Sequence, residues 1–172
     1  MSLLTSSPAI AFIALGSNLG DSQSVLREAI QQLQAISRQP LVQSSLWQTS
    51  PVDCPPGLPP FVNAVVALVP GAQETPESLF AKLQAMEKEF GRQPKKVLNE
   101  PRPLDLDLIA FGREMRNTPE LTLPHPRAHL RRFVLQPLSE IAPRLILPGQ
   151  AKTIAELLGN LPANEALLRL AP

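Results

Sequence analysis

The chain has 172 residues, of which 16 are basic and 15 acidic, so its formal net charge at pH 7 is +1. Proteins that coat nucleic acid or bind membranes through polybasic surfaces need a large positive excess, and the charge balance argues against both classes. Hydrophobic residues make up 44% and charged residues 18% of the chain, which predicts one globular domain over residues 1–172.

Hydrophobic patterning in the first half of the chain predicts three strands and one helix. The apolar run 10–15 is typical of a buried strand, and it ends at a glycine-containing turn. Apolar residues at helical spacing then predict a helix over 22–36, with Ser22 as its N-cap. Two further segments, 41–49 and 61–69, are predicted strands.

The second half of the chain predicts a helix, a strand and a longer extension. A Thr-Pro start and a glycine stop bound a helical segment at 75–91. Residues 104–111 are a predicted strand, and residues 128–140 a predicted helix that contains a proline. A last short strand is expected at 144–147 and a last helix at 153–158.

The order of these elements is β-α-β-β-α-β followed by further helices and loops. This order favours an α+β fold, a ferredoxin-like β-α-β-β-α-β sandwich with a C-terminal helical and loop extension, over a doubly wound parallel sheet. The short links between helices and strands predict that the helices lie on a face of the sheet.

Cysteine content and hydropathy indicate in which cellular compartment the protein is expected. Cys54 is the only cysteine, so the chain can form neither an internal disulfide nor a cysteine-rich zinc site, and a small buried or half-buried side chain is expected. The segment 1–9 has no Lys or Arg, and no apolar run reaches the ~18 residues of a membrane span. We therefore expect a cytoplasmic protein without a membrane partner.

A pair of aspartates alternates with leucines in the predicted strand 104–111. Alternation places Asp105 and Asp107 on one face, with Cα atoms ~7 Å apart, and the leucines in the core. Two neighbouring carboxylates repel each other and need compensation. A hard cation such as Mg²⁺ would supply it; the alternative is a solvated polar face with Arg102 as salt-bridge partner.

Two basic clusters flank this strand. The first contains Arg92, Lys95, Lys96 and Arg102, and the second contains Arg127, Arg131 and Arg132. Arginines around a bound metal suit a polyphosphate, although charged loops are more often simply solvated. The sequence has no P-loop and no dinucleotide-binding glycine motif, so any phosphoryl chemistry would use carboxylates and arginines instead.

The two histidines, His125 and His129, have helical i, i+4 spacing. The prolines on either side of His125 interrupt a helix there, which argues against a zinc site. A phosphate contact is the more plausible role for His125, and a structural hydrogen bond is the alternative.

Aromatic and amide side chains suggest a site for a flat heterocycle. Phe61 and Asn63 share one face of a predicted strand, and Phe133 follows the second basic cluster. An aromatic ring can stack on a heterocycle while an amide hydrogen-bonds to its edge. Packing of each phenylalanine in the core is the simpler alternative.

Six short motifs follow one another in a fixed order along the chain: ALGSNLGD at 14–21, TSP at 49–51, FVNA at 61–64, PRPLDLDL at 101–108, LPHP at 123–126 and RFVLQPL at 132–138. In this order they resemble the 6-hydroxymethyl-7,8-dihydropterin pyrophosphokinases of folate synthesis. The resemblance covers about residues 10–148, the expected core of a single pyrophosphokinase domain.

The resemblance implies a ferredoxin-like fold and a defined reaction. The pterin hydroxymethyl oxygen attacks the β-phosphorus of ATP, pyrophosphate is transferred whole, and AMP leaves. Two Mg²⁺ ions are expected with ATP as cofactors, and the partners are the two small-molecule substrates, with no nucleic acid. A monomer is expected. The loops 50–60 and 92–103 match lids that close over the substrates.

The resemblance also assigns residues. Asp105 and Asp107 match the metal ligands, and they are catalytic together with the phosphate-clamping Arg92 and Arg102. The remaining ATP contacts are Gln84, Glu87, Leu108, Thr122, His125 and Arg131. The pterin contacts are Thr49, Ser50, Val52, Phe61, Asn63 and Phe133.

The chain departs from the pattern of the family at three points. Asn99-Glu100 stands where many members have Trp-Gly, Pro94 where some have arginine, and Pro126 where some have tyrosine. Two other functions remain open: a Mg²⁺-dependent transferase with a different acceptor, and a non-catalytic ferredoxin-like binding module.

Overall fold

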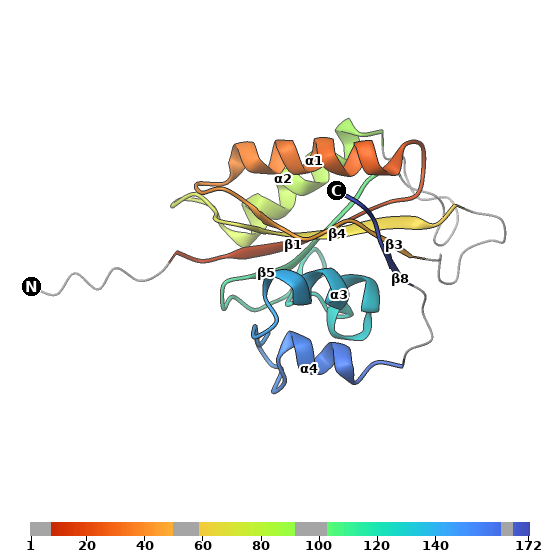
Figure 1. The fold of residues 1–172 in the computed structure, drawn as a ribbon. Helices are drawn as coiled ribbons and strands as arrows, with labels where there is room; N and C mark the ends of the chain where they lie inside the picture. Colours follow the sequence, from red (N-terminus) through yellow and green to blue (C-terminus); the bar gives the residue numbers. More distant parts are fainter. Residues whose placement is uncertain (1–7, 50–58, 92–102, 163–166) are drawn as a thin grey trace, which may run out of the picture.

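An antiparallel sheet lies between two layers of helices (Figure 1). The structure is a computed structural model and describes residues 8–49, 59–91, 103–162 and 167–172. Helices α1 (Ser22–Ile36) and α2 (Pro76–Glu89) cover one face, while α3 (Arg132–Ile141) and α4 (Ile154–Gly159) lie on the other side. Within the described part of the chain, every helix is too short or too polar to cross a membrane.

The main sheet has six strands, which include β2 (Val42–Gln43), β3 (Trp47–Thr49) and β8 (Leu167–Arg169). Its order is β5-β1-β4-β3-β8, and β2 also pairs with β4. Central strands β1 (Ala11–Ser17) and β4 (Phe61–Leu68) pair with each other, and β1 also pairs with β5 (Asp105–Phe111). All of these pairings are antiparallel. The structure therefore confirms the α+β fold that the predicted β-α-β-β-α-β order favoured.

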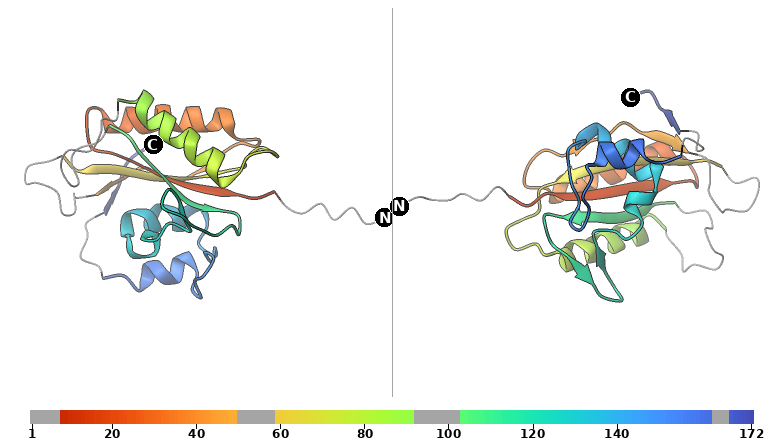
Figure 2. Two further views of the ribbon diagram at one scale, coloured as in Figure 1. Left: turned by 180° about the vertical axis from the view of Figure 1, so that it is seen from behind. Right: turned by 90° about the horizontal axis from the view of Figure 1, so that it is seen from below.

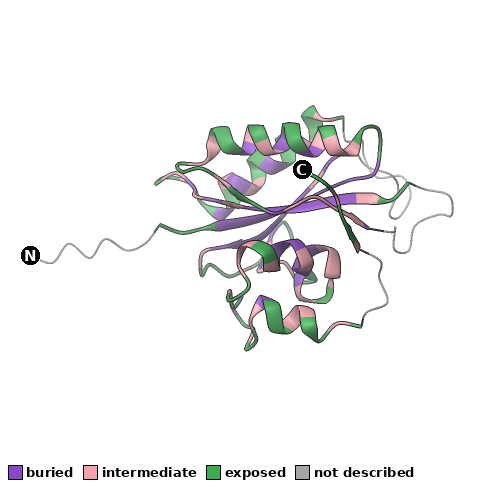
Figure 3. Cartoon of the chain, in the orientation of Figure 1, coloured by how far each residue is buried: buried purple, intermediate pink, exposed green. Residues whose placement is uncertain are grey.

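The alternation of apolar side chains along the central strands builds two cores, and Figure 3 shows the buried strands between exposed helix surfaces. Ile13 and Leu15 of β1 pack with Leu26 of α1 and Leu83 of α2 in the first core. The second core, under α3 and α4, includes Phe12 and Ala14 of β1, Val65 of β4, Leu135 of α3 and Ile154 of α4.

Helix starts follow local capping chemistry. Thr75 caps α2, where its side chain accepts a hydrogen bond from the backbone N–H of Ser78, as the Thr-Pro start predicts. The predicted N-cap of α1, Ser22, is wrong by one residue. Asp21 is the N-cap, because its carboxylate accepts from the N–H of Ser24 at 3.2 Å and suits the positive end of the helix dipole.

The predicted strand 41–49 is divided into β2 (Val42–Gln43) and β3 (Trp47–Thr49). Ser44 stands at the break and is buried. Its hydroxyl accepts from the N–H of Val65 at 2.9 Å, and its own N–H donates to the carbonyl of Val65 at 2.9 Å. The hydroxyl of Ser44, instead of a backbone carbonyl, thus accepts this hydrogen bond, and the regular pairing of β2 with β4 ends here.

The predicted helix 128–140 is also divided, into the 3₁₀ turn η1 (Ala128–Leu130) and α3. Arg131 separates them because its backbone is extended, with φ −113° and ψ 113°. The predicted strand at 144–147 is wrong: the N–H of Leu145 bonds to Ala142 and its carbonyl accepts from Ile154, so this segment makes turns under α3.

Three short strands were not predicted. β6 (Arg116–Asn117) and β7 (Thr122–Leu123) form a small hairpin, and β8 (Leu167–Arg169) adds a final strand to the main sheet. Figure 2 shows β8 at the sheet edge from two further directions.

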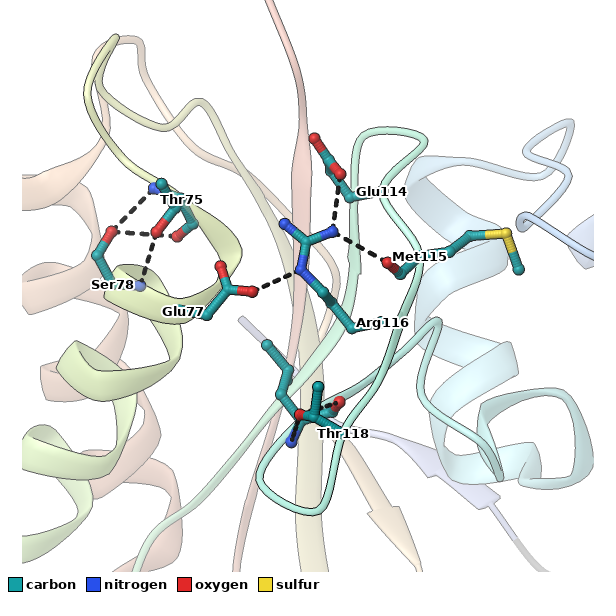
Figure 4. A network of polar contacts seen from close by, with 8 residues as sticks. Thr75, Glu77, Ser78, Glu114, Met115, Arg116 and Thr118 are labelled. Carbon is teal, nitrogen blue, oxygen red and sulfur yellow. Dashed lines mark hydrogen bonds and ion pairs between the residues drawn. The ribbon is translucent and has the colours of Figure 1, made fainter.

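Arg116 ties the small hairpin to helix α2 (Figure 4). Its guanidinium donates to Glu77 in the first turn of α2, and to Glu114 at 2.9 Å. The hydrogen bond from Arg116 to Glu77 lowers the pKa of the Glu77 carboxyl. The hairpin is therefore held beside the N-terminal end of α2, next to the strand that carries the aspartate pair.

Candidate active site

The aspartate pair lies on the face of the sheet that α3 covers in part. Asp105 and Asp107 are half-buried, while the leucines that alternate with them are buried in the first core. In the register of the sheet, Asp105 is opposite Gly16 and Asp107 opposite Ala14 of β1. The predicted alternation is confirmed.

The donor set of the two aspartates fits Mg²⁺. Both side chains come from one strand face, and no cluster of three or more His, Cys, Asp or Glu side chains is found among the described residues. Mg²⁺ usually binds through one or two carboxylates together with substrate phosphates and water. Zinc prefers a full set of nitrogen and sulfur ligands, for which His125 and His129 alone are insufficient.

His125 is anchored to β5 through its backbone. Ile109 is an extra residue in this strand, because Phe12 pairs with Ala110 and Ile13 with Leu108. The carbonyl of Ile109 accepts a 2.8 Å hydrogen bond from the N–H of His125. A β-bulge thus re-aims the backbone to hold His125 beside the strand of the aspartate pair.

The imidazole of His125 is neutral at physiological pH. Burial lowers its pKa to about 4, and the positive charge of Arg131 adds to this effect, while Asp105 opposes it. Nδ1 accepts from the N–H of Arg127 at 3.2 Å, so the proton resides on Nε2. The ring therefore offers a hydrogen-bond donor that is suited to a phosphate oxygen.

The N-terminus of α3 adds positive potential to this region. Arg131 is the N-cap residue, and neither a side-chain cap nor an acidic residue occupies the first turn. The guanidinium of Arg131 lies over the ring of Phe133, with Cζ 5.4 Å from the ring centroid. A helix N-terminus together with an arginine favours an anionic ligand.

Asn63 and Thr49 form a buried polar pair on two neighbouring strands. Thr49 Oγ1 donates to Asn63 Oδ1 at 2.8 Å, and both residues are buried. A Cβ atom on Gly16 would lie 3.0 Å from Asn63 Nδ2, so the glycine leaves room for this amide. The orientation of the carboxamide is consequently determined, with Oδ1 engaged by the hydroxyl.

Phe61 and Phe133 complete the predicted heterocycle contacts. Phe61 is half-buried and lies two residues before Asn63, so both project from the α3 side of β4. Phe133 is half-buried and packs against the second core. The sheet face thus carries the ring of Phe61, an amide and the aspartate pair, and α3, which packs on the same side, carries Phe133.

The predicted nucleotide contacts lie around the outer edge of β5. Glu87 of α2 accepts from the N–H of Leu106 at 2.9 Å, between the two aspartates in sequence. Gln84 is exposed on α2, and Thr122 is half-buried on β7. The side chain of Leu108 is buried in the first core, so the structure does not bring this side chain to the aspartates.

Some residues singled out from the sequence lie outside the described residues. They are Ser50, Val52, Cys54, Arg92, Pro94, Lys95, Lys96, Asn99, Glu100 and Arg102. The predicted lids over 50–60 and 92–103 fall almost entirely in the same segments.

Two contributors to the site were not recognised from the sequence as such. The sequence predicts that Gly16 begins a turn, whereas the structure places it inside β1, and its closeness to Asn63 depends on the pairing of β1 with β4. Ile109 was one of several apolar residues in a strand. No local signal marks it as the bulged residue, because the bulge is defined by the register with β1.

Comparison with known proteins agrees with this geometry. The sequence model of the family described as "7,8-dihydro-6-hydroxymethylpterin-pyrophosphokinase (HPPK)" matches residues 12–143. The 2-amino-4-hydroxy-6-hydroxymethyldihydropteridine pyrophosphokinase of Haemophilus influenzae is 36% identical over 162 residues, which cover 94% of this chain and 98% of that protein.

Longer proteins contain a similar segment. The folic acid synthesis protein fol1 of Pneumocystis carinii is 37% identical over 145 residues, covering 84% of this chain and 19% of that protein. The crystal structure of wild-type HPPK-DHPS of Plasmodium falciparum with pteroate has the same fold, with a TM-score of 0.68 at 14% identity. That match covers 89% of this chain, which spans less than half of the solved chain, 42%.

The family match extends from β1 to the end of α3 and includes every described residue of the aspartate, histidine and amide sites. The chain therefore belongs to the 7,8-dihydro-6-hydroxymethylpterin-pyrophosphokinase (HPPK) family and is a pyrophosphokinase.

Proposed function

We propose that the chain transfers pyrophosphate from ATP to the hydroxymethyl group of 6-hydroxymethyl-7,8-dihydropterin, with Mg²⁺ as cofactor. The observation that carries this proposal is the convergence of two sites on one sheet face. Asp105 and Asp107 lie on β5, and the Asn63–Thr49 pair lies across β1 on β4 and β3. One set suits a metal-bound triphosphate and the other a flat heterocycle.

The pterin is held by the amide pair and the aromatic rings. Asn63 has its Oδ1 engaged by Thr49, so its remaining donor capacity can hydrogen-bond to the edge of a heterocycle. Phe61 and Phe133 supply surfaces for stacking. These contacts orient the hydroxymethyl group toward the aspartates.

The triphosphate is held by cationic and neutral donors. His125 donates through Nε2–H, Arg131 adds a guanidinium, and the N-terminus of α3 adds its dipole. Asp105 and Asp107 would hold Mg²⁺, which, when bound, neutralises phosphate charge and lowers the pKa of the attacking hydroxyl.

The reaction balances as a single displacement. The hydroxymethyl oxygen forms a bond to the β-phosphorus and loses its proton. The bond between the β-phosphorus and the oxygen that bridges to the α-phosphorus breaks, and AMP leaves. We expect the enzyme to act as a cytoplasmic monomer on these two small molecules, and its net charge of +1 supports partners other than nucleic acid.

Product analysis tests this function. The purified protein is incubated with Mg²⁺, ATP and the reduced hydroxymethylpterin, and the nucleotides are resolved by chromatography. The expected result is AMP formed one-for-one with a pyrophosphorylated pterin. ADP as product would identify an ordinary kinase, and tight pterin binding without turnover would identify a binding module; either result would overturn the proposal.

A further inference from the structure

The C-terminal strand β8 covers the edge of β3. Leu167 pairs with Thr49 and Arg169 with Trp47 in antiparallel register. Beyond the strand, the N–H of Leu170 donates to the carbonyl of Leu46 at 2.9 Å, and the Leu170 side chain packs against the first core. A three-residue strand is thereby held on both of its edges, by β4 on one side and by β8 on the other.

Side chains reinforce this pairing at one point, which we call the C-terminal clamp and define by Ser45, Glu140 and Arg169. Ser45 Oγ donates to Glu140 Oε2 at 2.9 Å and accepts from Arg169 Nε at 2.8 Å. Arg169 Nη2 lies 3.9 Å from Glu140 Oε2. Glu140 also accepts from the N–H of Ser45 and from the indole N–H of Trp47. The clamp thus joins α3, β3 and β8.

Helix α3 also holds the chain segment that leads toward β8. Arg132, at the start of this helix, donates from Nη2 to the carbonyls of Leu161 and Pro162, each at 3.1 Å. Glu140 lies near the other end of the same helix. The C-terminal extension is therefore attached to α3 at both ends of the helix, and the helix that carries Arg131 and Phe133 is linked to the strand that carries Thr49.

The clamp acts at a short distance from the pterin contacts. Trp47, which donates to Glu140, is the register partner of Asn63, and Thr49 lies two residues further along β3. The hydroxyl of Thr49 is what determines the orientation of the Asn63 amide. A displacement of β3 along or away from β4 would alter this hydrogen bond before it altered the aspartates on β5, because β4 and β1 lie between β3 and β5.

We propose that Glu140 and Arg169 are positioning residues for the pterin: through β3 they set the Thr49–Asn63 pair, and they do not touch either substrate. This role rests on the proposed function, because it assigns the Thr49–Asn63 pair to the pterin. Loss of the clamp is expected to raise the KM for the pterin roughly tenfold, the effect of about one charge-assisted hydrogen bond, with kcat and the KM for ATP changed by less than about twofold.

Arg169→Ala is the informative variant, because the Arg169 side chain is 65% exposed and its removal leaves both cores intact. Arg169→Lys retains the charge and is expected to recover part of the affinity. Leu168→Ala is the matched control: Leu168 belongs to the same strand, is 60% exposed, and is expected to leave all kinetic constants unchanged.

Trp47 provides an independent readout, since the chain has one tryptophan and no tyrosine. Breaking the clamp is expected to shift its emission in Arg169→Ala and not in Leu168→Ala. Steady-state kinetics with each substrate varied in turn, together with these spectra, test whether the clamp positions the pterin contacts. If the wild type turns over normally, either of two results for Arg169→Ala would overturn the proposed role of the clamp alone. One is an equal increase in the KM values for both substrates, and the other is an unchanged KM for the pterin. A wild type that forms no pyrophosphorylated pterin would overturn the proposed function, and with it the role of the clamp.

Discussion

The backbone N–H of His125 donates a 2.8 Å hydrogen bond to the carbonyl of Ile109, the extra residue in β5. This bond connects the segment after the β6–β7 hairpin to the strand of the aspartate pair. Because Asp105 influences the pKa of the His125 ring, the two groups share one electrostatic environment. The bulge therefore brings the imidazole of His125 and the carboxylates of the aspartate pair together from segments that are separated in sequence.

Removal of either aspartate tests the metal assignment. Asp105→Ala or Asp107→Ala is expected to lower turnover by about 10³-fold or more, because several kcal/mol of charge stabilisation by the metal would be lost. The fold should survive, since both side chains point away from the first core. Product formation and circular dichroism check the two expectations, with the exposed Glu120→Ala as control. Normal activity in both aspartate variants would refute the assignment.

Gly16→Ala tests the closeness of β1 to the amide pair. The new Cβ would lie 3.0 Å from Asn63 Nδ2, and overpacking of this kind costs about 1–3 kcal/mol of stability. We expect a higher KM for the pterin and little change in the KM for ATP. Gly71→Ala is the control, because a Cβ there meets nothing within 4 Å. Equal behaviour of the two variants in thermal denaturation and kinetics would contradict this expectation.

Phe133→Leu tests stacking on the pterin. Leucine preserves apolar contact with the second core, where Phe133 is half-buried, but removes the aromatic face. The affinity for the pterin should fall about threefold to tenfold, in line with the energy of one aromatic contact. Calorimetric titration measures this change. Phe80→Leu, at a half-buried position of the first core, should leave pterin affinity unaltered; a similar loss in both variants would indicate a general packing defect.

The lowered pKa of His125 predicts acid sensitivity of the fold. With a folded-state pKa of about 4 against 6.5, the unfolded chain binds a proton at higher pH than the folded chain does. The free energy of unfolding should therefore be unaffected by this group above pH 6.5 and fall as the pH drops toward 4, by roughly 2 kcal/mol after allowing for solvent that still reaches the ring.

His125→Gln removes this titration, so its unfolding free energy should depend less on pH than that of the wild type between pH 7.5 and 4.5. Urea denaturation at several pH values measures both slopes. His129→Gln is the control, because His129 occupies the neighbouring 3₁₀ turn. Parallel slopes for wild type and His125→Gln would show that the ring does not stay neutral in the folded state.

Local sequence patterns were sufficient wherever one residue and its near neighbours decide the outcome. The alternation of leucine and aspartate in β5 predicted which side chains enter the first core, because a strand has a period of two. The Thr-Pro start of α2 predicted its cap, because capping involves residues only three positions apart. The order of strands and helices likewise predicted the α+β sandwich.

Long-range pairing decided the rest. Ser44 ends β2 because its hydroxyl meets Val65, and Glu140 meets Ser45 at a separation of 95 residues. The strand β8 forms because the edge of β3 is open to it. No window of the sequence contains both partners of such a contact. Residue types and their period therefore predicted the chemistry of the site, whereas the register between distant strands, set by packing of the whole chain, determined how the aspartates, His125 and Asn63 come together.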